Sequence, residues 1–141
     1  MKISFKTFDY LPEESIKIRT DVFVIEQGFI DEFDENDNKS IHVLMYDENT
    51  AIGTCRIIYS NEHNSIAIGR FAIVKEYRRK HLGQALMKEA EKIIIKKYGH
   101  IRVGVGAQER AENFYKSVGF IPTNEKYVEQ DCPHIWMLKE L

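Results

Sequence analysis

The sequence predicts a mixed α/β fold in which a twisted sheet is flanked by helices. Residues 66–74 form an apolar run interrupted only by Gly69 and Arg70, as expected of an interior strand covered on both faces. From Leu82 onward apolar residues recur at helical spacing, and residues 101–106 again read as a strand. A strand, a helix and a second strand in this order give a parallel pair joined by a right-handed crossover.

The elements before this pair can be placed from periodicity and turn residues. Residues 3–8 alternate apolar and polar side chains, which predicts a first strand. Pro12, followed by Glu13 and Glu14, is typical of a helix start, and this helix is expected to end before Gly28. Residues 40–46 and 51–60 predict two strands that form an antiparallel meander with the strand at 66–74.

The remaining elements follow the long helix. Gly99 is expected to end that helix, and Gly119 to close a shorter helix over residues 109–118. Two further short strands are expected from residue 120 to the C-terminus. The sheet is therefore mostly antiparallel, with one parallel pair at its centre.

Length and composition indicate one domain over residues 1–141, because a chain of this size can bury a sizeable core. A net charge of −2 gives no overall reason to expect nucleic-acid binding. The N-terminal residues lack the apolar core of a signal peptide, and no apolar run is long enough to span a membrane. We therefore expect a cytoplasmic monomer or homodimer with no nucleic-acid or membrane partner.

Residues 31–39 form an acidic segment that is not expected to contribute to the core. Its aspartates offer oxygen ligands for calcium, but the segment lacks the glycine and the twelfth-position acid of an EF-hand loop, so no metal is expected. Attraction of a cationic amine substrate and a plain solvated loop remain as interpretations.

Residues 75–81 form a basic segment at the predicted N-terminus of the long helix. Unpaired N–H groups and the positive end of the macrodipole make such a terminus a ready anion site. Arg78, Arg79 and Lys80 add positive charge, and Gly83 allows the backbone to approach a ligand closely. The segment predicts a phosphate site, with a solvated basic turn as the alternative.

Residues 71–87 resemble the acetyl-CoA-binding motif of the GCN5-related N-acetyltransferases (GNATs), Arg/Gln-x-x-Gly-x-Gly/Ala. Arg78, His81 and Gly83 fall on the motif positions, and His81 replaces the first glycine. The resemblance implies that the loop amides hold the CoA pyrophosphate and that His81 either adopts the glycine conformation or perturbs the loop. The implied acetyl-CoA contacts on the strand and the loop are Phe71, Ala72, Ile73, Arg78, Arg79, Lys80, His81, Leu82, Gly83 and Gln84.

Residues 107–120 resemble a second motif of the same family, Asn-x-x-Ala-x-x-Phe-Tyr-x-x-x-Gly-Phe, with Gln108 in place of Asn. The resemblance implies that Gln108 and Phe114 also contact the cofactor and that Tyr115 is catalytic. A GNAT-like sheet of six to seven strands with about four flanking helices is implied as well. Residues 19–27, 41–42 and 127–137 extend the resemblance to the ElaA/YjcF-like branch.

The implied reaction is attack of a neutral amine, from a small molecule or a peptide, on the thioester of acetyl-CoA. The backbone N–H of Ile73 would stabilise the oxyanion, and Tyr115 would protonate the departing thiolate. The amine must lose a proton, and candidate acceptors are Glu26, His42, Glu129 and His134, of which His134 and Glu26 are preferred. Three of them, Glu26, His42 and His134, also have a purely structural interpretation.

Three alternatives stay open at this point. Cys132, close to His134, raises the possibility of a Cys–His nucleophile, whereas Cys55 lies in a predicted strand and suggests a buried hydrophobe. A module that senses CoA without catalysis would keep the anion loop but would not need Tyr115. A nucleotide-phosphate site is disfavoured, because neither glycine-rich nucleotide fingerprint is present.

Overall fold

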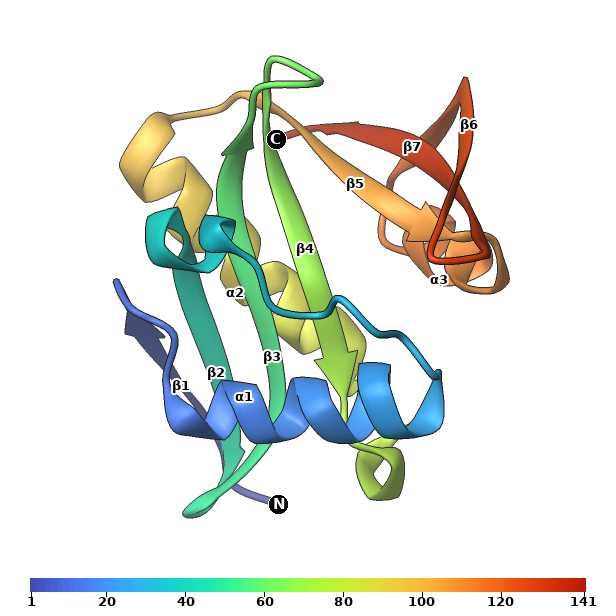
Figure 1. The fold of residues 1–141 in the computed structure, drawn as a ribbon. Helices are drawn as coiled ribbons and strands as arrows, with labels where there is room; N and C mark the ends of the chain where they lie inside the picture. Colours follow the sequence, from blue (N-terminus) through green and yellow to red (C-terminus); the bar gives the residue numbers. More distant parts are fainter.

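One seven-stranded sheet runs through the protein in the order β1-β2-β3-β4-β5-β7-β6 (Figure 1). The computed structural model describes every residue from 1 to 141. The strands are Ile3–Phe8 (β1), Ile41–Asp47 (β2), Thr50–Ser60 (β3), Ser65–Ile73 (β4), Arg102–Gln108 (β5), Ile121–Glu129 (β6) and Cys132–Glu140 (β7). The mixed, mostly antiparallel sheet is confirmed, but β6 and β7, which were expected to be short, each have nine residues.

Helical segments cover both faces of the sheet (Figure 1). Glu13–Arg19 (α1) continues into a π-helix, Thr20–Glu26 (η1), in front of the sheet, and Leu82–Tyr98 (α2) and Glu112–Ser117 (α3) lie behind it. Short 3-10 helices complete the set at Glu35–Lys39 (η2), Lys75–Tyr77 (η3) and Glu109–Ala111 (η4). None of these helices has the length and apolarity needed to cross a membrane.

The parallel pair β4–β5 is confirmed, but the two strands are hydrogen-bonded to each other over only a short length. Their pairing is limited to residues 66–68 of β4 against 103–105 of β5. Beyond this point the strands diverge, as Figure 1 shows. Where they diverge, Arg70 has a φ of 47°, and the register with β3 shifts between Thr54 and Arg56. The second half of β4 therefore has an open edge that faces a gap in the sheet.

The core lies on both sides of this sheet. On β2, Val43 and Met45 face the cluster under α2, whereas Leu44 and Tyr46 face the cluster under α1 and η1. Burial of both strand faces explains the continuous apolar sequence of β2. Ala72 of β4 belongs to the cluster under α1, so its side chain points into the core.

The acidic segment is not a solvated loop, and the expectation that it contributes nothing to the interior was wrong. Glu32 and Asp37 are 2% and 3% exposed, and Arg19 of α1 lies between them at 1% exposure. Arg19 Nε donates to Glu32 Oε2 at 2.9 Å and Nη1 to Asp37 Oδ1 at 2.8 Å. Because these carboxylates are paired with a buried arginine, the segment can place them in the interior of the protein.

Candidate active site

Two cavities meet at the gap between β4 and β5. One, of about 460 Å³, opens between β4, β5 and the β6–β7 hairpin, and the other, of about 570 Å³, lies against the basic loop before α2. Phe71, Ala111 and Tyr115 line both cavities, so a ligand in one can meet a ligand in the other at these residues. We call them the upper cavity and the loop cavity.

The loop cavity is built from the basic segment and the start of α2. His81 has a φ of 60° and a ψ of 21°, the left-handed conformation that glycine adopts without strain, and Arg79 has a φ of 63°. His81 therefore takes up the glycine conformation. A Cβ on Gly83 would lie 2.9 Å from the Phe114 ring, so the helix start packs closely on α3.

Arg78 ties this loop to two other elements. Its Nε donates to the carbonyl oxygen of Ile73 at 2.9 Å, and both Nη atoms donate to the Glu26 carboxylate at 2.8 Å. These hydrogen bonds lower the pKa of Glu26. Glu26 thus lies beside the loop and does not line the upper cavity, where it was expected.

The backbone of Ile73 faces the gap. Val74 N–H donates to Ile52 of β3 at 2.9 Å, and successive residues of a strand direct their backbone groups to opposite sides. The N–H and C=O of Ile73 therefore point away from β3, which agrees with the hydrogen bond that its C=O accepts from Arg78. A backbone donor is thus presented at the open edge of β4.

Tyr115 lies at the junction of the cavities on α3. Its ring is only 9% exposed and packs against Phe71, Phe114 and Phe120, with centroid separations of 6.3, 5.2 and 6.0 Å. Burial raises its pKa, so the hydroxyl keeps its proton at neutral pH. This hydroxyl makes no hydrogen bond within the protein, and it is not among the fully covered unpaired atoms. It can therefore donate to a ligand in the cavities.

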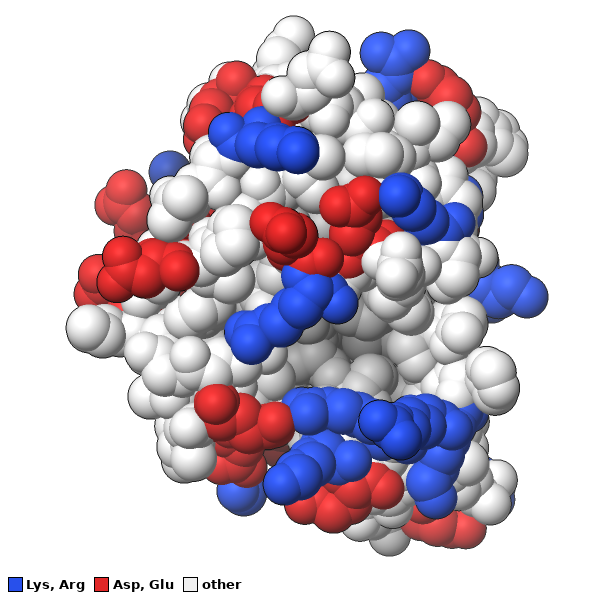
Figure 2. Space-filling model, turned by 90° about the vertical axis from the view of Figure 1, so that its right-hand side faces the viewer, with Lys and Arg blue, Asp and Glu red and all other residues white.

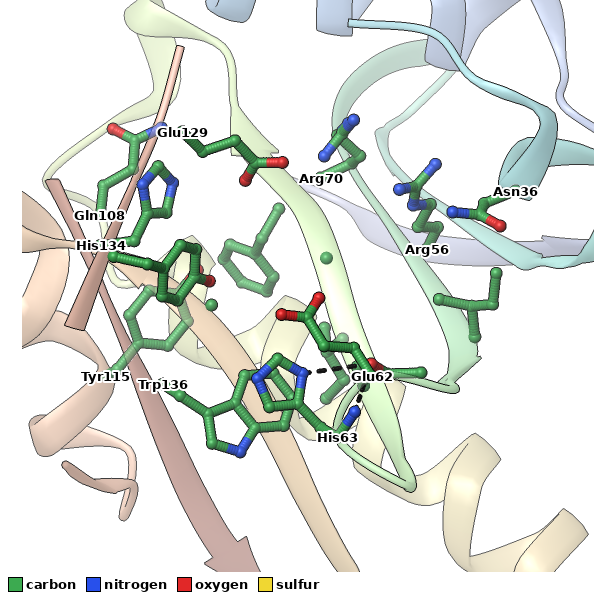
Figure 3. Close-up of a pocket in the computed structure, with 18 of the residues that line it drawn as sticks. Asn36, Arg56, Glu62, His63, Arg70, Gln108, Tyr115, Glu129, His134 and Trp136 are labelled. Carbon is green, nitrogen blue, oxygen red and sulfur yellow. Dashed lines mark hydrogen bonds between the residues drawn. The ribbon is translucent and has the colours of Figure 1, made fainter. Parts of the chain in front are cut away.

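The upper cavity has an aromatic wall provided by β6 and β7 (Figure 3). The His134 ring is 5.3 Å from that of Tyr127 and nearly parallel to it, and Nδ1 of His134 lies 2.8 Å from the Cys132 carbonyl oxygen. The Cys132 sulfur contacts the Pro133 carbonyl instead of an imidazole nitrogen. The Cys–His nucleophile is therefore not formed.

The surface around the gap has a marked charge pattern. Figure 2 shows Lys and Arg side chains gathered along the lower margin of a hollow, at the height at which Figure 1 places the loop between β4 and α2. Above the hollow, acidic and basic side chains lie next to one another (Figure 2). The positive charge is thus concentrated at the loop, as expected for an anion site on a protein of slightly negative net charge.

Comparison with known proteins agrees with this geometry. Residues 12–141 match the family model of the acetyltransferase (GNAT) domain. The chain belongs to the GNAT acetyltransferases. This GNAT acetyltransferase is 33% identical to protein ElaA of Escherichia coli (strain K12) over 132 residues, which cover 89% of this chain and 85% of ElaA. It is 30% identical to the uncharacterized N-acetyltransferase YjcF of Bacillus subtilis (strain 168) over 135 residues, which cover 91% of this chain and 94% of YjcF.

Solved structures show the same fold. The crystal structure of Escherichia coli ElaA superposes with a TM-score of 0.85 at 29% identity, covering 98% of this chain and 99% of that chain. A GNAT family acetyltransferase from Elizabethkingia anophelis, with acetyl-CoA bound, gives a TM-score of 0.75 at 15% identity over 99% of both chains. The predicted resemblance to the ElaA/YjcF-like branch is thereby confirmed.

Most of the sequence-predicted site residues of this GNAT acetyltransferase line one of the two cavities. Gln108, Glu129 and His134 line the upper cavity. The loop cavity is lined by Phe71, Ile73, Arg78, Arg79, His81, Leu82, Gly83, Gln84 and Phe114. Ala72 and Lys80 line neither, since Ala72 packs in the core and Lys80 lies 5.8 Å over the Tyr77 ring.

His42, another expected site residue, also lies outside the two cavities. It is 1% exposed, and its Nε2 lies 2.8 Å from the Asp37 carbonyl oxygen. Burial lowers its pKa, which favours the neutral ring. His42 therefore supports η2 from within the protein and reaches neither cavity.

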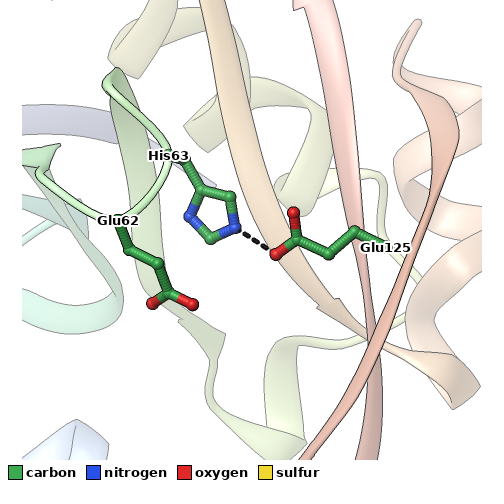
Figure 4. Close-up of side chains that lie close together, drawn as sticks. All are labelled: Glu62, His63 and Glu125. Atoms are coloured by element: carbon green, nitrogen blue, oxygen red, sulfur yellow. Dashed lines mark hydrogen bonds and ion pairs between the residues drawn. The ribbon is translucent and has the colours of Figure 1, made fainter.

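Several side chains of the upper cavity were not found from the sequence. The ring of His63, in the β3–β4 turn, stacks on Trp136 with centroids 3.7 Å apart, and its Nε2 is hydrogen-bonded to Glu125 of β6 (Figure 4). The ligand atoms of His63, Glu125 and Glu62 lie within 4.8 Å of one another. Glu62 and His63 are neighbours in the sequence, but Glu125 is 62 positions from His63, and no local motif connects them.

Proposed function

We propose that this GNAT acetyltransferase transfers an acetyl group from acetyl-CoA to a primary amine of a small molecule or peptide, by direct attack in a ternary complex. The observation that carries the proposal is the meeting of the two cavities at Tyr115, beside the open edge of β4. The acetyl-CoA of the Elizabethkingia anophelis structure, which has the same fold, supports the choice of cosubstrate.

The loop cavity would receive acetyl-CoA. The free N–H groups at the start of α2 suit a pyrophosphate, and no acidic residue in the first turn opposes an anion there. Arg79 and His81 line this end of the cavity, and Phe114 and Ile73 line its path toward Tyr115. The upper cavity would then hold the amine.

The chemical step follows from these positions. The amine nitrogen forms a bond to the thioester carbon, and the Ile73 N–H stabilises the negative charge that develops on the carbonyl oxygen. The carbon–sulfur bond then breaks, and Tyr115 gives its proton to the sulfur. Burial raises the pKa of Tyr115, and the same surroundings make a thiolate that departs beside it a stronger base, which favours transfer of the proton to the sulfur.

The proton lost by the amine would pass to His134. Nδ1 of His134 faces the Cys132 carbonyl oxygen, which can only accept a hydrogen bond, so the ring carries its proton there. Nε2 is then left with a lone pair that can take the proton from the amine. Glu129 lies in the same cavity and could stabilise the resulting imidazolium.

The first experiment is calorimetric titration with acetyl-CoA, CoA and ATP, followed by a thiol-release screen of primary amines. We expect a Kd of about micromolar order for acetyl-CoA, much weaker binding of ATP, and CoA release that depends on an amine. Absence of acetyl-CoA binding would disprove the proposal. Tight binding without turnover of any amine would favour a CoA-sensing module instead.

The conformation of His81 can be tested directly. His81→Gly is expected to bind acetyl-CoA at least as tightly as the wild type, because glycine takes a positive φ without strain. His81→Val should bind about tenfold more weakly, since a β-branched residue in this conformation costs roughly 1–2 kcal/mol. Calorimetry gives both Kd values. Equal affinity of all three proteins would show that binding does not need this loop shape.

His134→Ala is expected to lower kcat about a hundredfold, the usual contribution of a positioned proton acceptor, and to leave the Kd of acetyl-CoA unchanged. His100→Ala is the matched control, because His100 is exposed and lines neither cavity. Steady-state thiol release and calorimetry separate the two effects. An unchanged kcat would remove His134 from the mechanism.

A further inference from the structure

The upper cavity extends along β4. Its lining runs from Phe71, which packs against Tyr115, through residues 67–70 to Glu62 in the β3–β4 turn. Phe71 and Ala67 are four steps apart on the strand, which corresponds to roughly 13 Å at the ordinary rise of a strand. An acceptor whose reacting amine lies at Tyr115 can therefore place a second group near the turn.

Two carboxylates meet at this turn. Oxygens of Glu62 and Glu125 and an imidazole nitrogen of His63 lie within 4.8 Å of one another. His63 Nε2 donates to Glu125 (Figure 4), whereas the Glu62 carboxylate has no hydrogen bond or ion pair within the protein. Because like charges this close repel each other, a cation beside Glu62 would be stabilised.

The arginines of the cavity do not compensate this negative charge. Ion pairs join three arginines to three carboxylates in one cluster: Arg19, Arg56, Arg70, Glu32, Asp34 and Asp37. The unpaired Nε of Arg56 is fully covered by the protein, so no ligand reaches it. Glu62 and Glu129 line the same cavity, are exposed and lack an ion-pair partner. The surplus charge of the cavity is therefore negative and open to a ligand.

The phenol of Tyr127 reports this negative potential inside the cavity. Tyr127 lines the cavity, and its hydroxyl lies over Gly106 of β5, where any Cβ would collide with it. Burial raises the pKa of Tyr127 to about 12, and three carboxylates add to the effect: Glu129, Glu125 and Glu62. The three glutamates thus act on one region, in which aromatic rings also favour a cation.

Two polar side chains at the other end of the cavity also lack a partner. Tyr115 and His134 are each 9% exposed and line the cavity. The Tyr115 hydroxyl has no hydrogen bond in the protein, and His134 is bonded only through Nδ1, so its Nε2 is unpaired. Neither atom is fully covered, so a ligand can reach both. These atoms mark the end at which the amine reacts, and Glu62 marks the opposite end (Figure 3).

We propose that the acceptor is a diamine or polyamine, whose reacting amine lies between Tyr115 and His134 and whose second ammonium group lies at Glu62. This assignment rests on the proposed function, because it names the substrate class of the same site. The reacting amine must be neutral, and a carboxylate beside it would oppose loss of its proton. Glu62, at the turn, instead attracts the amine that stays protonated.

The first test compares acceptors that differ only in the charge of the distal group. 1,5-Diaminopentane, 5-aminopentan-1-ol and 5-aminopentanoate form one set, and 1,8-diaminooctane, 8-aminooctan-1-ol and 8-aminooctanoate form a longer set. With kcat/KM calculated per unprotonated reacting amine, we expect the diamine to exceed the amino alcohol about five- to tenfold in at least one set, as for an ammonium near partly exposed carboxylates. The amino acid should be the poorest acceptor. A diamine no better than the amino alcohol in both sets would overturn the proposal.

Substitutions of Glu62 test the distal site itself. Glu62→Gln should lower the ratio of kcat/KM for the diamine to that for the amino alcohol about three- to fivefold, and Glu62→Lys should abolish the preference. Glu13→Gln, at an exposed position of α1 outside both cavities, is the control and should keep the wild-type ratio. An unchanged ratio in Glu62→Lys would overturn the assignment.

A binding experiment separates this inference from the proposed function. Calorimetry in the presence of CoA would compare N-acetyl-1,5-diaminopentane with N-acetyl-5-aminopentan-1-ol, which requires no turnover. Failure to acetylate any amine would refute the proposed function, whereas tighter binding of the cationic compound, weakened by Glu62→Gln, would still support the ammonium site. Equal binding of the two compounds, or no binding of either, would overturn it.

Discussion

Tyr115→Phe is expected to lower kcat by about 10²–10⁴-fold, the usual range for loss of a general acid. The substitution removes one hydroxyl and keeps the aromatic contacts with Phe71, Phe114 and Phe120, so the fold and the loop cavity should be preserved. The Kd of acetyl-CoA should therefore stay within about twofold, because that hydroxyl has no partner in the resting protein. Single-turnover thiol release measures the loss, and calorimetry measures the affinity.

Tyr98→Phe is the matched control, since Tyr98 is 41% exposed at the end of α2 and lines neither cavity. The pH profile gives a further check. Because burial raises the pKa of Tyr115, its protonated form persists to higher pH, and Tyr115 should cause no loss of kcat between pH 7 and about 9. A Tyr115→Phe enzyme with wild-type kcat would refute the general-acid role.

Arg19→Ala is expected to lower the free energy of unfolding by about 3–5 kcal/mol, the usual effect of removing one partner of a buried ion pair. Glu32 and Asp37 would remain buried at 2% and 3% exposure without the guanidinium between them. Urea denaturation measures the change. Lys17→Ala is the control, because the Lys17–Asp21 pair on the same helix is largely exposed, and such pairs contribute about 0–1 kcal/mol. Similar losses for both variants would disprove the structural role of Arg19.

The same variant should change the acid dependence of stability. The hydrogen bonds and charges of Arg19 and Arg56 outweigh burial and lower the pKa of Asp37 to about 2, from an ordinary 3.8. A lowered pKa contributes stability that is present above the unfolded value and lost as the pH falls toward 2. Burial raises the pKa of Glu32 above 4.5. The contribution of Glu32 to the free energy of unfolding is therefore fully present below pH 4.5. The decline between pH 4 and 2 should therefore be shallower in Arg19→Ala.

The parts of this protein that could be predicted from sequence are those set by local order. The parallel pair followed from a strand, a helix and a strand in succession, and the start of α2 at Leu82 followed from the apolar spacing after the basic segment. The left-handed conformation of His81 was one of the two outcomes that the sequence left open, because His81 stands where the family motif has glycine. In each case the determining residues are neighbours in the chain.

The parts that could not be predicted depend on partners far apart in sequence. From its sequence the acidic segment is expected to be solvated. In the structure, Arg19 and Arg56, which lie 18 and 19 positions from Asp37, donate hydrogen bonds to it. Glu26 pairs with Arg78 across 52 positions, and this pairing takes it out of the upper cavity. The free Nε of Arg56 depends on the register that sets it beside Gly69. No periodicity or composition encodes such pairings.

The divergence of β4 and β5 has a consequence for how the protein avoids aggregation. It creates an unpaired strand edge in the interior of the sheet, and such edges normally recruit strands from other chains. In this protein, two bridges narrow the approach of another chain to the open edge of β4. Gln108 at the end of β5 donates to Gln27 at 2.9 Å, and the Gln130 side chain accepts from the N–H groups of Ile30 and Asp31. A slender extended ligand can add to this edge as a strand would, whereas a polypeptide strand from another molecule meets these bridging segments first.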